Sequence, residues 1–440
     1  MELSGKRVMI VGLGVSGRDA ARFVAARGAH LVLTDSNPNL DRANLPTGEV
    51  HLGAESDSWL DGVDLVIASP GVPRDSKLLA GAAARGISVI GEIELACRFI
   101  KAPIAAITGT NGKSTVTVML GEIMKAAGRR TFVGGNLGTP LVDAVGADYG
   151  VVVAEVSSFQ LETVDRFHPR VAIHLNLTDD HFDRYDGLED YGRAKARIFE
   201  NQDARDFAIL NRDDPNVFKL AREVRSHVVT FGMSKPEFRS ALWPVERAIV
   251  FDFGSHHGQI NLDGFHLTGR HNIANAMAAA GAALAMGVEP HVIEHALSEF
   301  KGLAHRIQLV HEKNGVRWID DSKGTNVGAV VEAIDATPAP IILIAGGVDK
   351  GGDYSPLRAP LGEKVRLAIF NGAARDKMRD ALAGATEIAV VPTLKDAVNQ
   401  AARAARPGDS VLMSPACSSF DQFKDYAHRG KVFEELVRAL

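Results

Sequence analysis

The chain has 440 residues, of which 46% are hydrophobic and 23% are charged, and its net charge is −5. This composition is typical of a globular protein, the length predicts about three domains, and the charge excludes the basic surface that nucleic acid or an anionic membrane would need. The two cysteines provide neither a disulfide framework nor a metal-binding pair, and no leader or membrane-length apolar run is visible, so we expect a cytoplasmic protein.

Short runs of branched apolar residues alternate with alanine-rich segments of helical period along the chain. This alternation predicts an α/β protein whose parallel sheets are covered by helices. We expect a Rossmann-like N-terminal domain (residues 1–97), a central P-loop ATPase-type domain (98–302) and a Rossmann-like C-terminal domain (303–440). The predicted strands are Val8–Val11, Leu31–Thr34, Leu65–Ala68, Ile87–Ile90, Ile104–Thr108, Val151–Val156, Val171–Leu175, Ala208–Leu210, Ile341–Ala345, Leu367–Phe370 and Ser410–Met413.

The first glycine loop, Gly12-Leu-Gly-Val-Ser-Gly17, follows the first predicted strand and precedes a helix, and Asp35 ends the next strand. This is a dinucleotide fingerprint, in which glycines let the backbone and the helix N-terminus approach a diphosphate. The pattern does not distinguish NAD from UDP, because Asp35 can accept a hydrogen bond from a ribose or from a uracil. A nicotinamide-dependent dehydrogenase is therefore one reading. Ser69-Pro-Gly71 supplies another loop at a strand's C-terminal end, where ligands bind in such sheets.

The second glycine loop, Thr108-Gly-Thr-Asn-Gly-Lys-Ser114, follows the strand predicted at Ile104–Thr108 and precedes a helix. The usual phosphate-binding pattern would place a glycine where Ile107 stands, so this loop is a variant whose leading glycine is shifted to Gly109. Its backbone amides can still surround phosphate oxygens, Lys113 can bind the β- and γ-phosphates, and the Ser114 hydroxyl can coordinate Mg²⁺. The loop predicts binding of ATP with magnesium.

Three later residues suit a metal site beside such a loop. Glu155 ends an apolar strand, where an unpaired carboxylate would be costly without a metal. His181 follows another apolar run, although alone it reads more simply as a loop histidine. Lys195, read as an unmodified lysine, is expected to be a solvated helix residue. A desolvated neutral lysine can instead capture CO₂ as a carbamate, whose oxygens suit Mg²⁺.

The segment from residue 233 to 267 has a weaker helical pattern and glycine turns such as Phe253–Gly258. We expect a small antiparallel extension there. An alanine-rich helix at Asn272–Met286 follows, and the second domain boundary is predicted near Lys301-Gly302.

Taken together, these motifs resemble the Mur ligase family. The resemblance rests on the second glycine loop, on Glu155, on Asn176-Leu-Thr-Asp-Asp-His181 and on Lys195. It extends through Gly134-Gly-Asn-Leu-Gly138, Leu267–Asn275, His305-Arg306 and Asp320–Asn326. It therefore covers nearly the whole chain and implies the three-domain fold and amide-bond formation driven by ATP.

The resemblance implies roles for individual residues. Lys113, His181, Lys195 and Arg306 would serve catalysis, and Ser114, Glu155, His181 and carbamylated Lys195 would hold two Mg²⁺ ions. The implied ATP-binding residues are Gly109, Thr110, Asn111, Gly112, Lys113, Ser114, Thr115, Asn272, Asn275, Arg306, Asp321 and Lys323. The implied UDP-sugar-binding residues are Val15, Ser16, Asp35, Ser36, Ser69, Gly71 and Asn136.

The ends of the chain indicate the branch of the family. The segment Leu412–Gly430 resembles the members that add D-glutamate to UDP-N-acetylmuramoyl-L-alanine, and no motif like that of the diaminopimelate-adding or lysine-adding members is present. By this analogy Thr325, Lys350, Ser419, Phe420 and Tyr426 would surround the incoming glutamate. Relatives often have leucine at position 420 and phenylalanine at position 426. Addition of L-alanine or L-glutamate stays an alternative.

The implied reaction begins with transfer of the γ-phosphoryl group of ATP to a carboxylate, because a carboxylate is a poor acylating agent until its oxygen becomes a leaving group. An amine then displaces phosphate from the acyl phosphate. We expect ATP, two Mg²⁺ ions and a CO₂-derived carbamate as cofactors, and a monomer. A dehydrogenase, or a regulatory nucleoside triphosphatase without acyl transfer, would leave Glu155, His181, Lys195 and the C-terminal segment unexplained.

Overall fold

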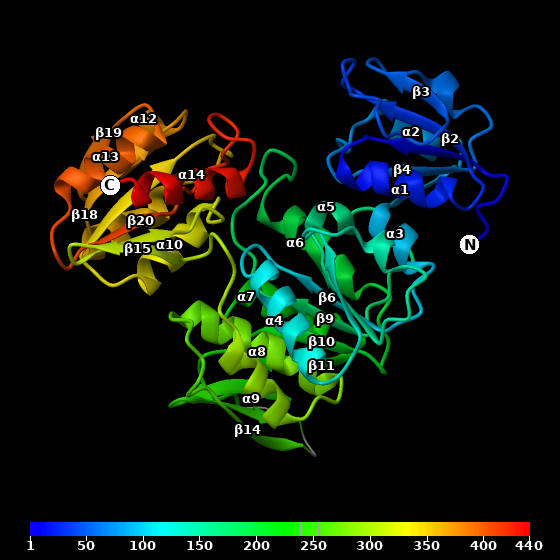
Figure 1. The fold of residues 1–440 in the computed structure, drawn as a ribbon. Helices are drawn as coiled ribbons and strands as arrows, with labels where there is room; N and C mark the ends of the chain where they lie inside the picture. The colour runs from blue at the N-terminus through cyan, green and yellow to red at the C-terminus, as the bar shows by residue number, and fades with distance from the viewer. Residues whose placement is uncertain (238–239, 254–255) are drawn as a thin grey trace. The chain divides into compact units, whose positions relative to one another are not determined.

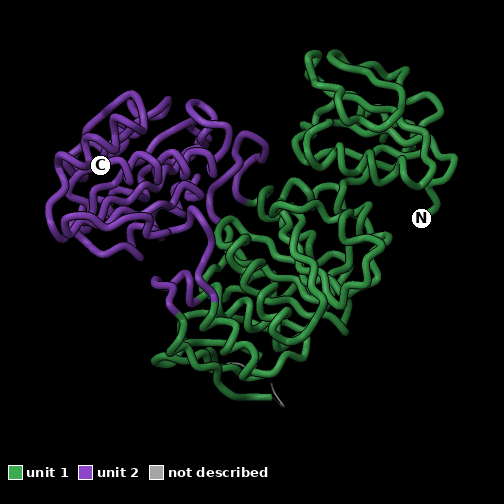
Figure 2. The backbone as a smooth tube through the Cα atoms, in the orientation of Figure 1, with its two compact units in different colours: residues 1–177, 189–265, 274–299 green, residues 178–188, 266–273, 300–440 purple. Residues whose placement is uncertain are grey.

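The computed structural model describes residues 1–237, 240–253 and 256–440. The chain forms two compact units, one of residues 1–177, 189–265 and 274–299 and the other of residues 178–188, 266–273 and 300–440 (Figure 2). Three sheets with helices packed on them confirm the α/β class (Figure 1). No described helix is both long and apolar enough to cross a membrane.

The first sheet belongs to the first unit and is parallel throughout, in the order β3-β2-β1-β4-β5. Its central strands are almost wholly buried, as expected of a sheet with helices on both faces. The strand order reverses between β1 and β4, and ligands bind at such a reversal. The strands are β1 (Arg7–Val11), β2 (His30–Asp35), β3 (Glu49–Leu52), β4 (Leu65–Ala68) and β5 (Ser88–Gly91).

The second sheet also lies in the first unit and has nine strands, in the order β14-β13-β12-β11-β10-β9-β6-β8-β7. It is parallel from β7 to β12, and β12, β13 and β14 are antiparallel, which confirms the predicted extension. The turn expected at Phe253–Gly258 includes Gly254 and Ser255, which lie outside the described residues. The strands are β6 (Ile104–Thr108), β7 (Thr131–Gly135), β8 (Val151–Glu155), β9 (Val171–His174), β10 (Phe207–Asn211), β11 (His227–Phe231), β12 (Ala241–Val245), β13 (Ala248–Asp252) and β14 (His257–Asn261).

The third sheet belongs to the second unit, in the order β15-β16-β20-β17-β18-β19, with only β15 antiparallel to its neighbour. Its two faces carry separate hydrophobic clusters, one under α10, α11 and α12 and the other under α13 and α14. The strands are β15 (Gln308–Lys313), β16 (Val316–Asp320), β17 (Ile341–Gly346), β18 (Val365–Asn371), β19 (Glu387–Val390) and β20 (Ser410–Met413).

The helices cover these sheets, and α4 packs on β7 and β8 and against α9. Their bounds are α1 (Val15–Ala25), α2 (Lys77–Ala84), α3 (Glu92–Cys97), α4 (Lys113–Ala126), α5 (Ser158–Leu161), α6 (Leu188–Ala196), α7 (Pro215–Phe218), α8 (Arg270–Ala285), α9 (Pro290–Glu299), α10 (Val327–Ala336), α11 (Arg358–Lys364), α12 (Arg375–Leu382), α13 (Leu394–Ala404) and α14 (Tyr426–Arg438). Short 3₁₀ turns are η1 (Asp57–Leu60), η2 (Leu141–Ala144), η3 (Arg197–Phe199), η4 (Lys219–Arg222) and η5 (Ser355–Leu357).

Each predicted strand is present, with ends that agree to within about two residues. The two predicted domain boundaries fall between sheets, after α3 and after α9, and their exact positions stay predictions. The first two predicted domains lie in one compact unit, except for residues 178–188, 266–273 and 300–302 of the second, which belong to the other unit.

A buried carboxylate links α3, which follows the first sheet, to the loop between β8 and β9 of the second sheet. Glu94, in α3, has no exposed side-chain surface, and its Oε2 accepts hydrogen bonds from the backbone N–H groups of Asp165, Arg166 and Phe167, each at 2.9 Å. Its Oε1 accepts from Nε of Arg98 at 2.6 Å. With the Cys97 thiol, whose Sγ lies 3.8 Å from Oε2, five donors therefore meet on one side chain.

Replacing Glu94 with alanine should lower the free energy of unfolding by about 3–5 kcal/mol, because the Arg98 guanidinium and three amides lose their partner together. Denaturant unfolding followed by circular dichroism measures the change. Glu122→Ala is the matched control, since the Glu122 carboxylate lies on the surface of α4 and forms an ion pair with Lys125; its expected cost is below about 1 kcal/mol. Similar costs for the two variants would contradict this role.

Candidate active site

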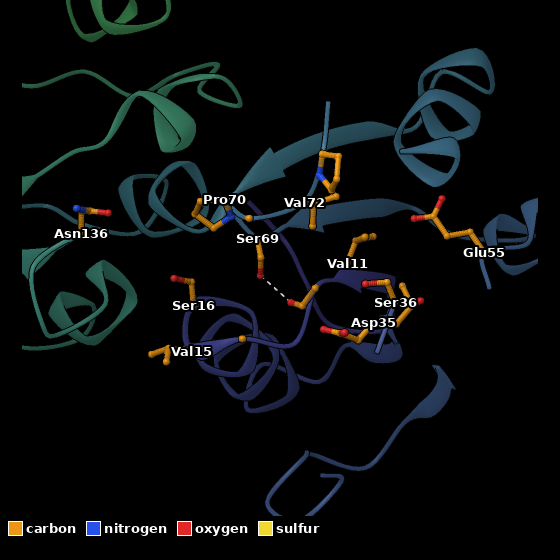
Figure 3. Close-up of a pocket in the computed structure, with 15 residues that line it drawn as sticks. Val11, Val15, Ser16, Asp35, Ser36, Glu55, Ser69, Pro70, Val72 and Asn136 are labelled. Carbon is orange, nitrogen blue, oxygen red and sulfur yellow. Dashed lines mark hydrogen bonds between the residues drawn. The ribbon is translucent and has the colours of Figure 1, made fainter. Parts of the chain in front are cut away.

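A cavity of about 480 Å³ lies at the strand reversal of the first sheet (Figure 3). All seven residues assigned to UDP-sugar binding line it, together with Val11, Gly12, Gly14, Thr34, Glu55, Pro70, Val72 and Pro73. Asn136 reaches it from the segment after β7, whereas the other lining residues come from the first sheet and its loops. Glu55 is a charged lining residue that the sequence patterns did not indicate.

The first glycine loop is held tightly from both sides. Oδ2 of Asp35 accepts from the backbone N–H of Leu13 at 2.7 Å, and the Ser69 hydroxyl donates to the carbonyl of Gly12 at 2.6 Å (Figure 3). A Cβ on Gly17 would lie 1.9 Å from the carbonyl oxygen of Gly12, so only glycine fits there. The structure thus explains the spacing of the fingerprint through close packing of the loop against α1.

The second glycine loop turns from β6 into α4 with the geometry of a phosphate cradle. Gly109 has φ +150° and Gly112 has φ +83°, values that favour glycine, and this confirms that the leading glycine has moved to position 109. Gly112 caps α4, so the helix's first amides lie beside the loop. Nζ of Lys113 donates to the carbonyls of Gly109 and Thr110, both at 2.8 Å.

Asn176 and Asn275 support this loop. Oδ1 of Asn176 accepts from the N–H of Asn111 at 2.8 Å, and its backbone carbonyl accepts from the N–H of Thr110 at 2.9 Å. Oδ1 of Asn275 lies so close to Gly112 that a Cβ there would meet it at 2.6 Å. The segment before His181 and the start of the alanine-rich helix therefore meet at the phosphate loop.

Glu155 lies at the end of β8 with 3% of its surface exposed. Its Oε1 accepts from Nδ2 of Asn136 at 2.8 Å. Its Oε2 is buried and has no hydrogen-bond partner among the described residues. An ionised carboxylate in this state is costly unless a cation completes it, so the donor set fits Mg²⁺ at this oxygen.

Lys195 is 1% exposed, so the expectation of a solvated helix residue is wrong. Its Nζ donates to the carbonyl of Gly109 at 2.8 Å and lies 4.5 Å from the ring centroid of Tyr191. The same carbonyl accepts from Lys113. Two lysine side chains therefore meet at one carbonyl oxygen of the phosphate loop. Tertiary packing of α6 over the loop, rather than local polarity, decides where Lys195 lies.

His174, at the end of β9, is a group that the sequence patterns did not single out. It is fully buried, and neither ring nitrogen has a partner among the described residues. Burial, followed by the charges of Lys195 and Lys113, lowers the pKa of the imidazole to about 3, so the ring is neutral at physiological pH. The sequence signal that could have identified His174 is a histidine at the end of an otherwise apolar strand.

The second unit holds the remaining residues assigned to ATP. Asp321 is 1% exposed, its Oδ2 accepts from the Ser414 hydroxyl at 2.6 Å, and burial raises its pKa to about 7. The positive charge of the Arg306 guanidinium partly offsets this rise by lowering the pKa of Asp321. Nζ of Lys323 contacts the Tyr426 hydroxyl at 3.1 Å. Nδ2 of Asn272 donates to the carbonyl of Thr268 at 2.7 Å.

The residues assigned to glutamate also lie in the second unit. Nζ of Lys350 donates to the Thr325 hydroxyl at 3.4 Å. Ser419 is buried, whereas Phe420 is 73% exposed. His181 has φ +57°, and its neighbour Asp180 contacts Nζ of Lys350 at 3.6 Å. Asp180 was not among the predicted site residues, although it precedes His181 directly.

Two other groups of histidine and carboxylate side chains converge among residues 1–237, 240–253 and 256–440. They are His168 with Asp203 and Asp206, and His305 with Asp320 and Glu434. Neither includes any of the predicted metal ligands Ser114, Glu155, His181 and Lys195.

Family models match most of the chain. The Mur ligase MurD-like N-terminal domain matches residues 6–91, the Mur ligase middle domain residues 107–283, and the Mur ligase glutamate ligase domain residues 305–417. The three matches follow the three sheets in order.

Curated relatives match from end to end. A UDP-N-acetylmuramoylalanine–D-glutamate ligase of Geotalea daltonii is 46% identical over 448 aligned positions, which cover 100% of this chain and 99% of the relative. Proteins of the same name from Syntrophotalea carbinolica and Pelotomaculum thermopropionicum are 45% and 42% identical, with the same coverage.

Solved structures share the fold at low sequence identity. A pseudomurein peptide ligase type C from Methanothermus fervidus has a TM-score of 0.64 at 19% identity, covering 99% of this chain and 100% of the other. MurF ligase from Thermotoga maritima in complex with ADP has a TM-score of 0.62 at 17% identity, covering 100% and 97%. These likenesses establish the three-domain architecture.

Proposed function

This chain belongs to the Mur ligase family, and from that premise we propose that it joins D-glutamate to UDP-N-acetylmuramoyl-L-alanine at the expense of ATP, a step of peptidoglycan precursor synthesis. The observation that carries the proposal is end-to-end identity of 42–46% to curated relatives of that name. A phosphate loop beside a buried carboxylate with one unpartnered oxygen supplies the matching chemistry.

ATP binds, in this proposal, at the loop of Gly109 to Thr115. Ser114 and Glu155 hold the nucleotide's Mg²⁺, which suits the buried Oε2 of Glu155. His181 and carbamylated Lys195 hold a second ion. Bound Mg²⁺ would neutralise phosphate charge and orient the γ-phosphoryl group. Asn272 and Asn275 would bind the adenine, Asp321 the ribose, and Lys323 the phosphates or the acyl intermediate.

The reaction uses two displacements. The alanyl carboxylate of the UDP-sugar attacks the γ-phosphorus of ATP and ADP leaves, which gives an acyl phosphate. Lys113 and Arg306 bind the phosphoryl oxygens and stabilise the charge that develops on them. The α-ammonium of D-glutamate first loses one proton to solvent, the resulting amine attacks the acyl carbon, phosphate leaves, and a second proton is lost as the amide forms.

The cavity of the first sheet is proposed to bind the UDP part of the substrate. Its volume and the helix N-terminus of α1 at its edge suit a diphosphate. Asn136 lies at the side of the cavity nearest Glu155, its hydrogen-bond partner, so the reacting end of the sugar nucleotide would extend in that direction. Thr325, Lys350, Ser419, Phe420 and Tyr426 bind D-glutamate. We propose a cytoplasmic location, because the reaction consumes ATP, and a monomer stays the predicted form.

A substrate panel tests the function most directly. We expect ATP-dependent phosphate release only when UDP-N-acetylmuramoyl-L-alanine and D-glutamate are both present, and formation of their amide by mass spectrometry. L-Alanine, L-glutamate and diaminopimelate serve as alternative acceptors. Robust turnover with one of them in place of D-glutamate would overturn the specificity, and hydride transfer to NAD with no phosphate release would overturn the ligase assignment.

A further inference from the structure

We propose that Asp180 binds the α-ammonium group of the incoming amino acid and thereby acts as a specificity-determining residue for α-amino acids. This inference rests on the proposed function, since it concerns the D-glutamate that the ligase would use. It goes beyond it because Asp180 is assigned to neither a metal nor a substrate above.

The observation is a close pair of opposite charges in the second unit. Oδ1 of Asp180 lies 3.6 Å from Nζ of Lys350, and their side chains are 8% and 25% exposed. Nζ of Lys350 also donates to the hydroxyl of Thr325 at 3.4 Å. The anchor proposed for a substrate carboxylate is thus in contact with a protein carboxylate.

Asp180 is fixed in this position by its surroundings. Its Oδ2 accepts from Nδ2 of Asn326 at 3.3 Å, and its Oδ1 accepts from the backbone N–H of His181 at 3.0 Å. Oδ1 of Asn326 accepts from the N–H of Ala329 at 2.8 Å as the N-cap of α10. The amide of Asn326 is therefore oriented by the helix, and it holds the Asp180 carboxylate beside Lys350.

The spacing of this pair matches the charges of an amino acid. In a zwitterion the ammonium nitrogen is about 2.5 Å from the carboxylate carbon, so the two charges can lie against a carboxylate and an ammonium that are themselves neighbours. Lys350 and Thr325 would receive the substrate carboxylate, and Asp180 the substrate ammonium. Each charge of the ligand then replaces one partner of the existing ion pair, so that neither protein charge is left unpaired.

A simple charge-neutralising role for Asp180 makes a different prediction. If Asp180 only compensated Lys350, it would compete with every substrate carboxylate, with or without an amine. Glutarate has the same two carboxylates as glutamate and no amine. Comparing the two ligands therefore separates recognition of the ammonium from neutralisation of the lysine.

The experiment uses the full chain with saturating ATP, Mg²⁺ and UDP-N-acetylmuramoyl-L-alanine. We expect Asp180→Asn to raise the KM for D-glutamate about 10- to 100-fold, since hydrogen bonds between charged groups contribute that much to binding. The inhibition constant of glutarate should stay within about 3-fold of wild type or fall. Asp180→Glu should restore part of the affinity for D-glutamate. Asp380→Asn, on the exposed surface of α12, is the matched control and should change neither constant.

Equal changes in the constants for D-glutamate and glutarate would overturn the inference, as would an unchanged KM for D-glutamate. If Asp180→Asn has no turnover, equilibrium binding of both ligands by calorimetry, with a non-hydrolysable ATP analogue, makes the same comparison. Failure of the wild-type protein to use D-glutamate would instead reject the proposed function, so the two failures are distinguishable.

Discussion

Lys113→Ala is expected to abolish turnover, with a loss of kcat of at least about 10³-fold. The Lys113 ammonium is the charged donor of the phosphate loop, and stabilising charge on a transferring phosphoryl group is among the largest contributions to such catalysis. Its Nζ lies at the carbonyls of Gly109 and Thr110, and Lys113 is the one charged residue in the loop sequence Thr108–Ser114. ATP-dependent phosphate release and amide formation would both be measured.

Lys125→Ala is the matched control for this variant. Lys125 lies on the same helix, α4, with half of its side chain exposed and a surface ion pair to Glu122. Its loss should leave turnover within about 2-fold of wild type. Equal activity of Lys113→Ala and Lys125→Ala would place the phosphate site elsewhere in the protein.

Lys195→Ala is expected to lose activity by about 100-fold or more, and bicarbonate or a small carboxylic acid should restore part of it. Loss of a metal ligand should cost at least as much as the roughly 10- to 100-fold that loss of a ligand's outer partners costs. An acid can enter the space left by the side chain and supply the missing oxygen ligand. Activity is measured across a series of acetate and bicarbonate concentrations at fixed ionic strength.

Recovery distinguishes the carbamate from a packing role. Lys195 is buried against the phosphate loop, so its removal could also disturb the loop by creating a cavity. A cavity alone would not respond to acids, and full loss without recovery would favour that reading. Arg193→Ala controls for changes on α6, because the Arg193 side chain is 68% exposed and forms ion pairs with Glu189 and Asp190 on its own helix. Unchanged activity of Lys195→Ala would refute the role.

Much of the fold follows from local patterns. Parallel strands in such sheets are short, apolar runs, so Ile104–Thr108 and Ser410–Met413 could be predicted to the residue. Other strands carry no such pattern. β3 is the polar sequence Glu-Val-His-Leu at a sheet edge, and β7 ends in two glycines, so pairing with a neighbour rather than propensity makes them strands.

Some residues of the candidate site were also predictable from local sequence patterns, and others were not. The glycine loops were predictable because a positive φ and a close backbone approach demand glycine at fixed spacing. The burial of Lys195 and His174 was not, because it depends on α6 covering the ends of β6 and β9, which no short motif encodes. The pairing of Asp180 with Lys350 joins residues 170 positions apart in sequence, and only the folded second unit brings them into contact.

One side chain is shared by the two proposed ligand sites of the first unit. The amide of Asn136 lines the cavity of the first sheet and donates to Glu155 of the phosphate-loop site. Its orientation cannot change for one ligand without a free-energy effect on the other. Thermodynamic linkage then makes the effect reciprocal: any factor by which magnesium nucleotide strengthens sugar-nucleotide binding is the factor by which the sugar nucleotide strengthens binding of magnesium nucleotide.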